Sequence, residues 1–271
     1  MPDTPPIGDP VLAVAVRAAR RAASVIVDAA RDLKRLPTFS KEHGEIAASA
    51  DTEAASAIAA TISAAFPEHT IAGDDAENGT RPSGDSPYRW VVDAIDGARN
   101  FAHGYPYYAV SIALTHGGET TYAVVLDPVR DELYTAIRGK GAQLNGAPIR
   151  VSACTRLDDA LVGAVFPSRT SSRLDAFMPL VDTIARRCAG LRRGGSCALD
   201  LAYVACGRLD GHVVISAQPR DLAAGALVVR EAGGRVGDFA GGTEFLRTQE
   251  VIAASPGLFN PLREAIAAAR P

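Results

Sequence analysis

The chain has 271 residues, of which 47% are hydrophobic and 22% are charged. This composition excludes a disordered or coiled-coil protein and suits one large domain or two closely packed halves. The net charge of −3 predicts no general attraction to nucleic acid.

Neither a membrane span nor a cysteine framework is indicated. No stretch reaches the roughly 20 apolar residues of a spanning helix, and the start MPDTPPIGDP lacks a basic segment followed by an apolar run. We therefore expect a cytoplasmic protein. The four cysteines form no C-x-x-C pair, which favours buried free thiols over a zinc site or disulfides.

The first half of the chain begins with two predicted helices. Asp9 and Pro10 suit a helix start, and the apolar residues that follow recur at the helical period over 10–34. A second helix is predicted over 51–66, after a charged, Gly-containing loop. Short apolar runs predict strands of one sheet at 70–73, 89–95, 108–115, 121–127 and 131–137.

The second half alternates between strands and helices, which predicts layered α/β packing. Apolar runs predict strands at 160–166, 211–216 and 250–254, with a further short segment at 190–194. Helices are predicted at 173–188, 197–207, 221–232 and 257–269. The Gly-rich, polar run 139–152 is the best candidate boundary, so we divide the chain into halves 1–150 and 151–271.

The most informative segment runs from Trp90 to Phe101. An apolar strand leads directly into Asp93 and Asp96 and then into Gly97. Carboxylates at the end of a strand are rigidly held and suit hard cations, while a glycine lets backbone N–H groups approach an anion. By itself the pattern is more often that of a capped turn.

Two further acidic segments add to this pattern. An apolar run at 70–72 ends in Gly73 and the acidic residues Asp74, Asp75 and Glu77, which could equally form a solvated loop. Asp221 begins a predicted helix at its N-cap position, where simple capping would also explain it. The three segments together favour a metal site.

In this order the segments resemble the inositol monophosphatase family of magnesium-dependent, lithium-sensitive-type phosphatases. The family carries G-E-E, then W-[IV]-[IV]-D-P-[IL]-D-G-T-x-N-F, then W-D-x-A-x-G followed by E-A-G-G. Related runs occur here at 73–75, 90–101, 220–225 and 231–234, with further similarity at 106–112 and 195–211. The chain is identified as a divergent member of this family.

The resemblance implies a layered αβαβα sandwich, also seen in fructose-1,6-bisphosphatase, and a homodimer that binds two or three Mg²⁺ ions. The implied metal ligands are Asp74, Asp93, the carbonyl of Ile95, Asp96 and Asp221. The implied catalytic residues are Asp74, Asp93 and Asp51. Phosphate and substrate contacts are implied at Gly97, Ala98, Gly195, Ser196 and Val214. Most ligands thus fall in the first half, and Asp221 and the substrate side in the second.

Several positions depart from the family pattern near the expected chemistry. Ala98 stands where the family has Thr. The segment 41–51 resembles the family's mobile loop, and there Ala48 replaces a second Thr. Arg220 replaces Trp, and Asp74 replaces Glu. Val214 stands where many members carry a Glu that recognises ring hydroxyls, which makes inositol phosphate a less secure substrate.

Three interpretations of these departures stay open. The first is a divergent phosphatase that hydrolyses a small phosphate monoester, such as an inositol phosphate or a sugar phosphate. The second is a weak or inactive member with a binding or regulatory role. The third is a nucleotide or bisphosphate phosphatase that uses the basic run from Arg186 to Arg193, although a solvated helix end also explains that run.

Overall fold

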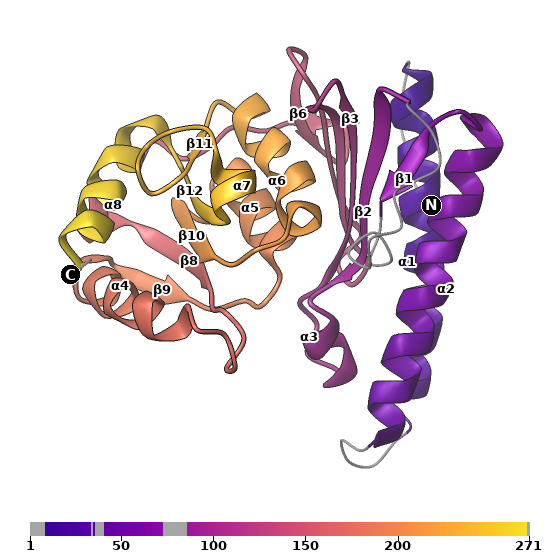
Figure 1. Ribbon diagram of the computed structural model, residues 1–271, viewed down its shortest axis with the longest axis horizontal. Coiled ribbons are helices and arrows are strands. Elements are labelled where there is room, and N and C mark those ends of the chain that lie inside the picture. Colours follow the sequence, from indigo (N-terminus) through magenta and orange to yellow (C-terminus); the bar gives the residue numbers. More distant parts are fainter. Residues whose placement is uncertain (1–8, 34, 36–40, 73–85, 270–271) are drawn as a thin grey trace.

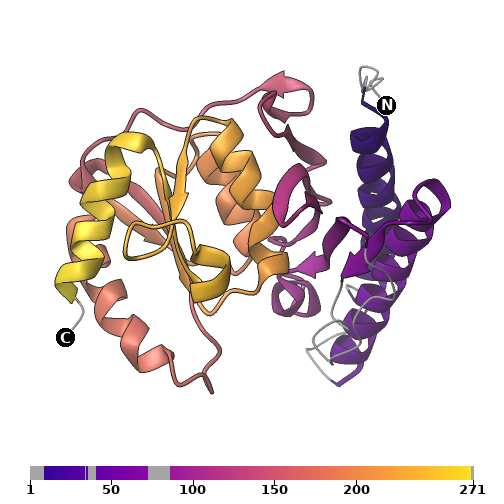
Figure 2. The same ribbon diagram turned by 45° about the horizontal axis from the view of Figure 1, so that its top comes forward.

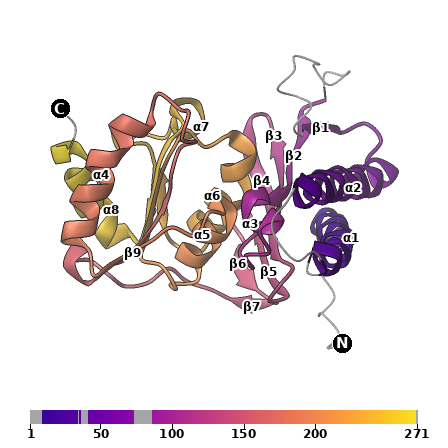
Figure 3. The same ribbon diagram turned by 90° about the horizontal axis from the view of Figure 1, so that it is seen from below.

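The computed structural model describes residues 9–33, 35, 41–72 and 86–269. Helix pairs alternate with two sheets along the long axis of the molecule (Figures 1 and 3). From one end the layers are a helix pair, a seven-stranded sheet, a second helix pair, a five-stranded sheet and a third helix pair. This architecture confirms the predicted layered αβαβα sandwich.

The outer helix pair consists of α1 (Pro10–Leu33) and α2 (Lys41–Ala65). The start of α1 confirms the prediction, since an Asp9 carboxylate oxygen accepts a hydrogen bond from the Val11 N–H at 3.0 Å. The predicted loop before the second helix is wrong, because residues 41–51 belong to α2. The buried face of this stretch consists of His43, Ala47 and Ala50, which are too polar or too small to give a clear apolar period.

The first sheet follows the chain order from β1 to β7. Its first two strands are parallel, and all its other neighbours are antiparallel. The strands are β1 (Thr70–Ala72), β2 (Tyr88–Asp96), β3 (Ala109–His116), β4 (Glu119–Asp127), β5 (Glu132–Ile137), β6 (Gly141–Leu144) and β7 (Ala147–Pro148). The last two strands lie within the Gly-rich run 139–152, where glycines in tight turns hid the alternation of two very short strands.

The second sheet has the order β11, β12, β10, β8, β9. Its strands are β8 (Leu161–Val165), β9 (Gly190–Arg192), β10 (Gly211–Ile215), β11 (Arg235–Gly237) and β12 (Glu250–Ala254). The helices are α3 (Ala98–Ala102), α4 (Leu174–Arg187), α5 (Cys197–Ala205), α6 (Pro219–Glu231), α7 (Phe245–Thr248) and α8 (Pro256–Ala269), with a 3₁₀ turn at Leu157–Asp159. Every element predicted beyond residue 155 is present, whereas β11 and α7 were not predicted. Figure 2 shows α4 and α8 on the outer side of this sheet.

Three hydrophobic clusters fill the interfaces between the layers. Residues of α1 and α2 pack against one face of the first sheet, and residues of α4 and α8 pack against the outer face of the second. The central cluster joins both sheets through α5 and α6. The two halves of the chain therefore share one core, while no described strand pairs from one half to the other.

The contact between α5 and α6 depends on a glycine. A Cβ atom added at Gly225 would lie 2.6 Å from the Cβ of Leu201, a clash that a rotamer change cannot relieve. We expect Gly225→Ala to lower the free energy of unfolding by about 1–3 kcal/mol, because overpacking exceeds the gain in helix propensity. Gly44→Ala on α2 meets nothing within 4 Å and should stabilise by roughly 0.5–1 kcal/mol. Urea denaturation of both variants checks this; similar changes in the two would contradict it.

The sequence predicts free cysteine thiols and no membrane span. All four cysteines are free thiols, with Cys197 buried and the other three half-buried. Within the described part of the chain, no helix combines the length and the apolar character needed to span a bilayer.

Candidate metal centre

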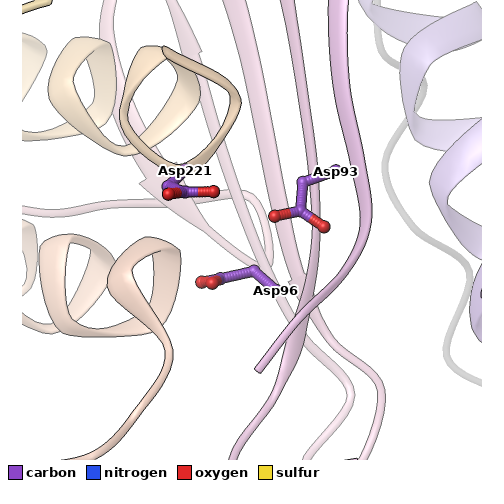
Figure 4. Close-up of side chains that lie close together, drawn as sticks. All are labelled: Asp93, Asp96 and Asp221. Carbon is purple, nitrogen blue, oxygen red and sulfur yellow. The ribbon is translucent and has the colours of Figure 1, made fainter. Parts of the chain in front are cut away.

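Three aspartates meet where β2 ends and α6 begins (Figure 4). Carboxylate oxygens of Asp93, Asp96 and Asp221 all lie within 4.8 Å of one another. Asp96 is 8% exposed, and the other two are half-buried. Such a buried set of oxygen ligands fits a hard divalent cation.

A local irregularity in β2 brings its two aspartates to the same side. In a regular strand, residues three apart point to opposite faces. The pairing of β2 with β3 shifts register between Asp93 and Asp96, as in a β-bulge, and so turns the second side chain toward the first. Ile95, between them, is 3% exposed and packs in the core beneath the helix pair α1 and α2.

Asp96 is held in place by the start of α5. Its Oδ2 accepts hydrogen bonds from the Ser196 hydroxyl and from the backbone N–H of Ala198, each at 2.6 Å. The same Ser196 oxygen accepts a bond from the Leu199 N–H and thereby caps the helix. Ser196 is fully buried, so the structure places this predicted substrate contact behind a candidate metal ligand.

Asp221 projects from the first turn of α6. The helix begins at Pro219 with Gln218 as its N-cap, so the predicted N-cap role of Asp221 is wrong: it occupies the third helical position. Its Oδ2 accepts a bond from the Gln218 backbone N–H at 2.8 Å. A proline that favours the first helical position explains the earlier start. On the other side, the Nε of Arg220 lies 3.9 Å from the Asp221 Oδ1.

Burial and mutual repulsion oppose the simultaneous ionisation of the three carboxylates. Burial raises the pKa of Asp93 well above its ordinary value, and repulsion from Asp96 and Asp221 raises it further. Burial likewise raises the pKa of Asp96 to about 7, with a further rise from Asp221, although the hydrogen bonds from Ser196 and Ala198 oppose it. A divalent cation would remove this repulsion, so the donor set fits the magnesium ions that the sequence implies.

The other residues predicted for the site do not all lie beside the three aspartates. Asp51 on α2 is close enough to raise the pKa of Asp93 further. Gly97, with φ 99°, precedes α3, whose first residue is Ala98, directly after the aspartates. Val214 is 1% exposed inside the central core, away from solvent. Asp74 lies outside the described residues.

Gly195 lies in the segment between β9 and α5, which contacts α3. It has φ +91°, and a Cβ there would lie 2.9 Å from the Nδ2 of Asn100. That Nδ2 donates to the Tyr107 carbonyl at 2.7 Å and to the Gly194 carbonyl at 3.0 Å. Gly195 therefore allows the approach to Asn100 that joins α3 to the segment before α5.

Two polar contacts next to the centre are not predicted from the sequence. The Ser111 hydroxyl on β3 donates to the Arg220 carbonyl at 3.4 Å and so ties the start of α6 to the sheet. The Tyr107 hydroxyl donates to Asp200 at 2.5 Å, deep in α5. A polar residue within an apolar strand, as at Ser111, is the only signal that could have drawn attention to the first contact.

Comparisons with known proteins identify the family of this chain. Residues 8–270 match the inositol monophosphatase family. The Nus factor SuhB of Vibrio cholerae is 40% identical over 247 residues, covering 91% of this chain and 92% of that protein, and that of Escherichia coli K12 is 41% identical with the same coverage. Among solved structures, the extragenic suppressor protein suhB of Bartonella henselae has a TM-score of 0.83 at 35% identity, covering 96% of this chain and 99% of that one. The inositol monophosphatase of Anabaena has a TM-score of 0.84 at 30% identity and covers 96% of both chains. This chain belongs to the inositol monophosphatase family.

Proposed function

We propose that this protein is a magnesium-dependent phosphomonoesterase that hydrolyses a small phosphate ester, such as an inositol phosphate or a sugar phosphate. The observation that carries the proposal is the convergence of Asp93, Asp96 and Asp221 within 4.8 Å. Such a cluster repels an anionic phosphate until cations reverse the local charge. Membership in a family of phosphatases supports the same reaction.

Each of these residues has a distinct part in the proposal. Asp93, Asp96 and Asp221 would hold two or three Mg²⁺ ions, together with Asp74 and the carbonyl of Ile95. When bound, magnesium supplies charge neutralisation and an activated water. Asp51 and Asp74 would orient that water. The bonds from Ser196 and Ala198 keep the Asp96 carboxylate in position as a ligand.

On the substrate side, the backbone N–H groups of Gly97 and Ala98 would hold the phosphate oxygens. Val214 is apolar and buried, and so would leave a ring hydroxyl without the partner that a Glu supplies. Gly195 would contribute by keeping the segment next to α3 close. These features favour a phosphate ester whose recognition does not depend on that hydroxyl.

Phosphate release from a panel of inositol, sugar and nucleotide monophosphates, with and without Mg²⁺, tests this function. We expect turnover that disappears when EDTA removes the metal. The ester turned over with the highest kcat/KM identifies the substrate class. Turnover that persists without divalent metal would contradict the proposal, and so would silence across the panel from folded, magnesium-bound protein.

Ala98 offers a gain-of-function test. The family has Thr at this position, and a hydroxyl there would add a hydrogen bond beside the phosphate site. One such bond contributes roughly 2.7–4 kcal/mol to barrier lowering, so Ala98→Thr should raise kcat on the order of a hundredfold. Ala98→Val, which has the same shape without the hydroxyl, is the matched control and should give no gain. Equal rates for the two variants would show that the hydroxyl is not what the site lacks.

A second candidate is a weak or inactive family member with a binding or regulatory role; two of the relatives are named Nus factor SuhB. The absence of hydroxyls at Ala48 and Ala98 and the guanidinium of Arg220 beside Asp221 favour it. It expects folded protein without turnover, and Ala98→Thr should either change nothing or restore activity. Robust wild-type turnover of any monoester would make this role unnecessary.

A third candidate function, a nucleotide or bisphosphate phosphatase, depends on the basic run from Arg186 to Arg193. Arg186 pairs with Asp182 on its own helix, and the Arg193 guanidinium lies 5.0 Å from the Phe166 ring centre. The carbonyl of Gly194, the next residue in the chain, accepts a hydrogen bond from the Asn100 side chain of α3. If Arg193 contacts a second phosphate, Arg193→Gln should raise KM for bisphosphates and leave KM for monophosphates unchanged.

The homodimer and the cytoplasmic location also belong to the proposal. Light scattering on the purified protein tests the first, and fractionation of the source cells tests the second. A monomer at micromolar concentration would contradict the homodimer.

A further inference from the structure

A cavity of about 630 Å³ lies beside the metal centre and is not used by the site described above. One wall is the face of the first sheet that looks toward α6, with Arg89 and Val91 of β2 and Thr115 of β3. The opposite wall is the start of α6, with Arg220 and Ala223, and Leu246 of α7. The cavity therefore spans the interface between the first sheet and the central helix layer.

Strand geometry connects this cavity to the aspartates. Side chains at positions 89, 91 and 93 of β2 alternate onto the same face, and Val91 packs against the central core on that face. Arg89 pairs with Thr115 and Asp93 pairs with Ser111, so the cavity wall and the metal centre lie along the same two strands. Four residues of strand correspond to about 13 Å. A ligand of that length could reach from the aspartates to Arg89.

Arg220 stands between the two sites. Its carbonyl accepts the bond from Ser111, which fixes its backbone above the strand pair that carries Asp93. Arg220 lines the cavity, and its Nε lies 3.9 Å from the Oδ1 of Asp221. Arg220 therefore belongs to the cavity wall and is also close to a candidate metal ligand.

The chemistry of the walls indicates the kind of occupant. Of the described residues that line the cavity, the two that carry charge are Arg89 and Arg220, and both are cationic. The wall between them is largely aliphatic, with Val91, Ala223 and Leu246. Guanidinium groups bind carboxylates and phosphates through paired hydrogen bonds. The combination suits an organic anion with an apolar or ring-shaped body.

We propose that this cavity binds the alcohol portion of the ester, and that Arg89 and Arg220 recognise a second anionic group on it, either a carboxylate or a phosphate. As a statement about substrates this rests on the proposed phosphatase function. Binding of an organic anion in the cavity does not, because it requires neither magnesium nor hydrolysis. The two can therefore be tested separately.

The decisive measurement is calorimetric titration in EDTA, where no cation in the metal centre can hold the probe. The probes are 3-phenylpropanoate and phenylphosphonate, with neutral 3-phenylpropanamide as the matched control. Charged hydrogen bonds contribute about 1.5–3 kcal/mol each, so we expect both anions to bind at least about tenfold more tightly than the amide. Preference for one anion over the other distinguishes a carboxylate from a phosphate as the recognised group.

Variants locate the binding. Arg89→Gln and Arg220→Gln should each weaken anion binding about tenfold, whereas Arg31→Gln on α1, in the outer layer, should not change it. Thr120→Glu keeps both arginines but adds a negative charge to the cavity wall, and it should weaken anion binding as well. Thermal melts confirm that each variant is folded. Equal binding of anion and amide, or full binding by Arg89→Gln and Thr120→Glu, would overturn the proposal.

The phosphatase reaction supplies a second readout. With Mg²⁺, the phosphate ester of 3-(4-hydroxyphenyl)propanoate should have a lower KM than that of 4-propylphenol, and Arg89→Gln should remove the difference. If neither ester is hydrolysed while anion binding persists in EDTA, the phosphatase function fails and the anion site stands. If both are hydrolysed with equal KM by the wild type, the anion subsite fails and the phosphatase stands.

Discussion

Asp93→Asn should abolish magnesium-dependent phosphate release and at the same time make the metal-free protein more stable. Asn has the same shape but no charge, so the centre loses one of its anionic ligands, and turnover should fall on the order of a thousandfold. Without metal, the same change removes a carboxyl group whose ionisation is opposed by burial and by repulsion from Asp96 and Asp221. The melting temperature in EDTA should therefore rise.

The opposite signs of these two effects make the prediction specific. A merely destabilised variant would lose turnover and melt earlier, whereas this one should lose turnover and melt later. Asp175→Asn, an exposed carboxylate in the first turn of α4, is the matched control and should change neither quantity. Phosphate release and calorimetric melting of the same preparations are the measurements. Wild-type turnover in Asp93→Asn would remove the centre from the reaction.

Stabilisation of the protein by Mg²⁺ should depend steeply on pH. In the folded, metal-free state the pKa of Asp96 is raised to about 7, from an ordinary value of 3.8. Between these values the folded protein binds more protons than the unfolded chain, so its stability falls as the pH rises through this window. Magnesium binds only the ionised carboxylate, and below pH 7 it must displace a proton. Its affinity should therefore fall about tenfold for each pH unit below about 7.

Melting temperatures measured with and without Mg²⁺ from about pH 5 to pH 8 check this. The increase caused by Mg²⁺ should be large at the alkaline end and small at the acidic end. Burial also raises the pKa of Asp200 to about 7, and the charge on Asp200 contributes to the raised pKa of Asp96, so the pH dependence of the increase reflects both carboxylates. In Asp96→Asn the pH dependence of the increase should weaken but not disappear, because burial also raises the pKa of Asp93. A constant increase in the wild type would contradict titration of the centre.

The sequence by itself was enough to predict the layered fold and the family. The apolar periods of α1, β2 and β3, and of most elements beyond residue 155, are strong because each packs one apolar face or strand against a neighbouring layer. Asp93, Asp96 and Asp221 could be named because each stands where an apolar element begins or ends. Local pattern suffices when a residue's role depends on its own element.

Elements with weak apolar patterns could not be predicted in this way. The first turns of α2 bury small or polar residues, and the neighbouring α1 decides that they are helical. The strands β6 and β7 are too short to alternate visibly and exist because β5 offers an edge with which to pair. In both places tertiary contacts overrode a weak local preference.

The arrangement of the centre was decided only by the tertiary structure. The register shift in β2 turns Asp96 toward Asp93, and Ser196, a hundred positions further along the chain, holds it there. The cavity with Arg89 and Arg220 likewise has walls from distant segments, which no spacing in the sequence could reveal. The sequence pattern predicts the local structure of each element, whereas the packing of the layers determines which side chains come into contact.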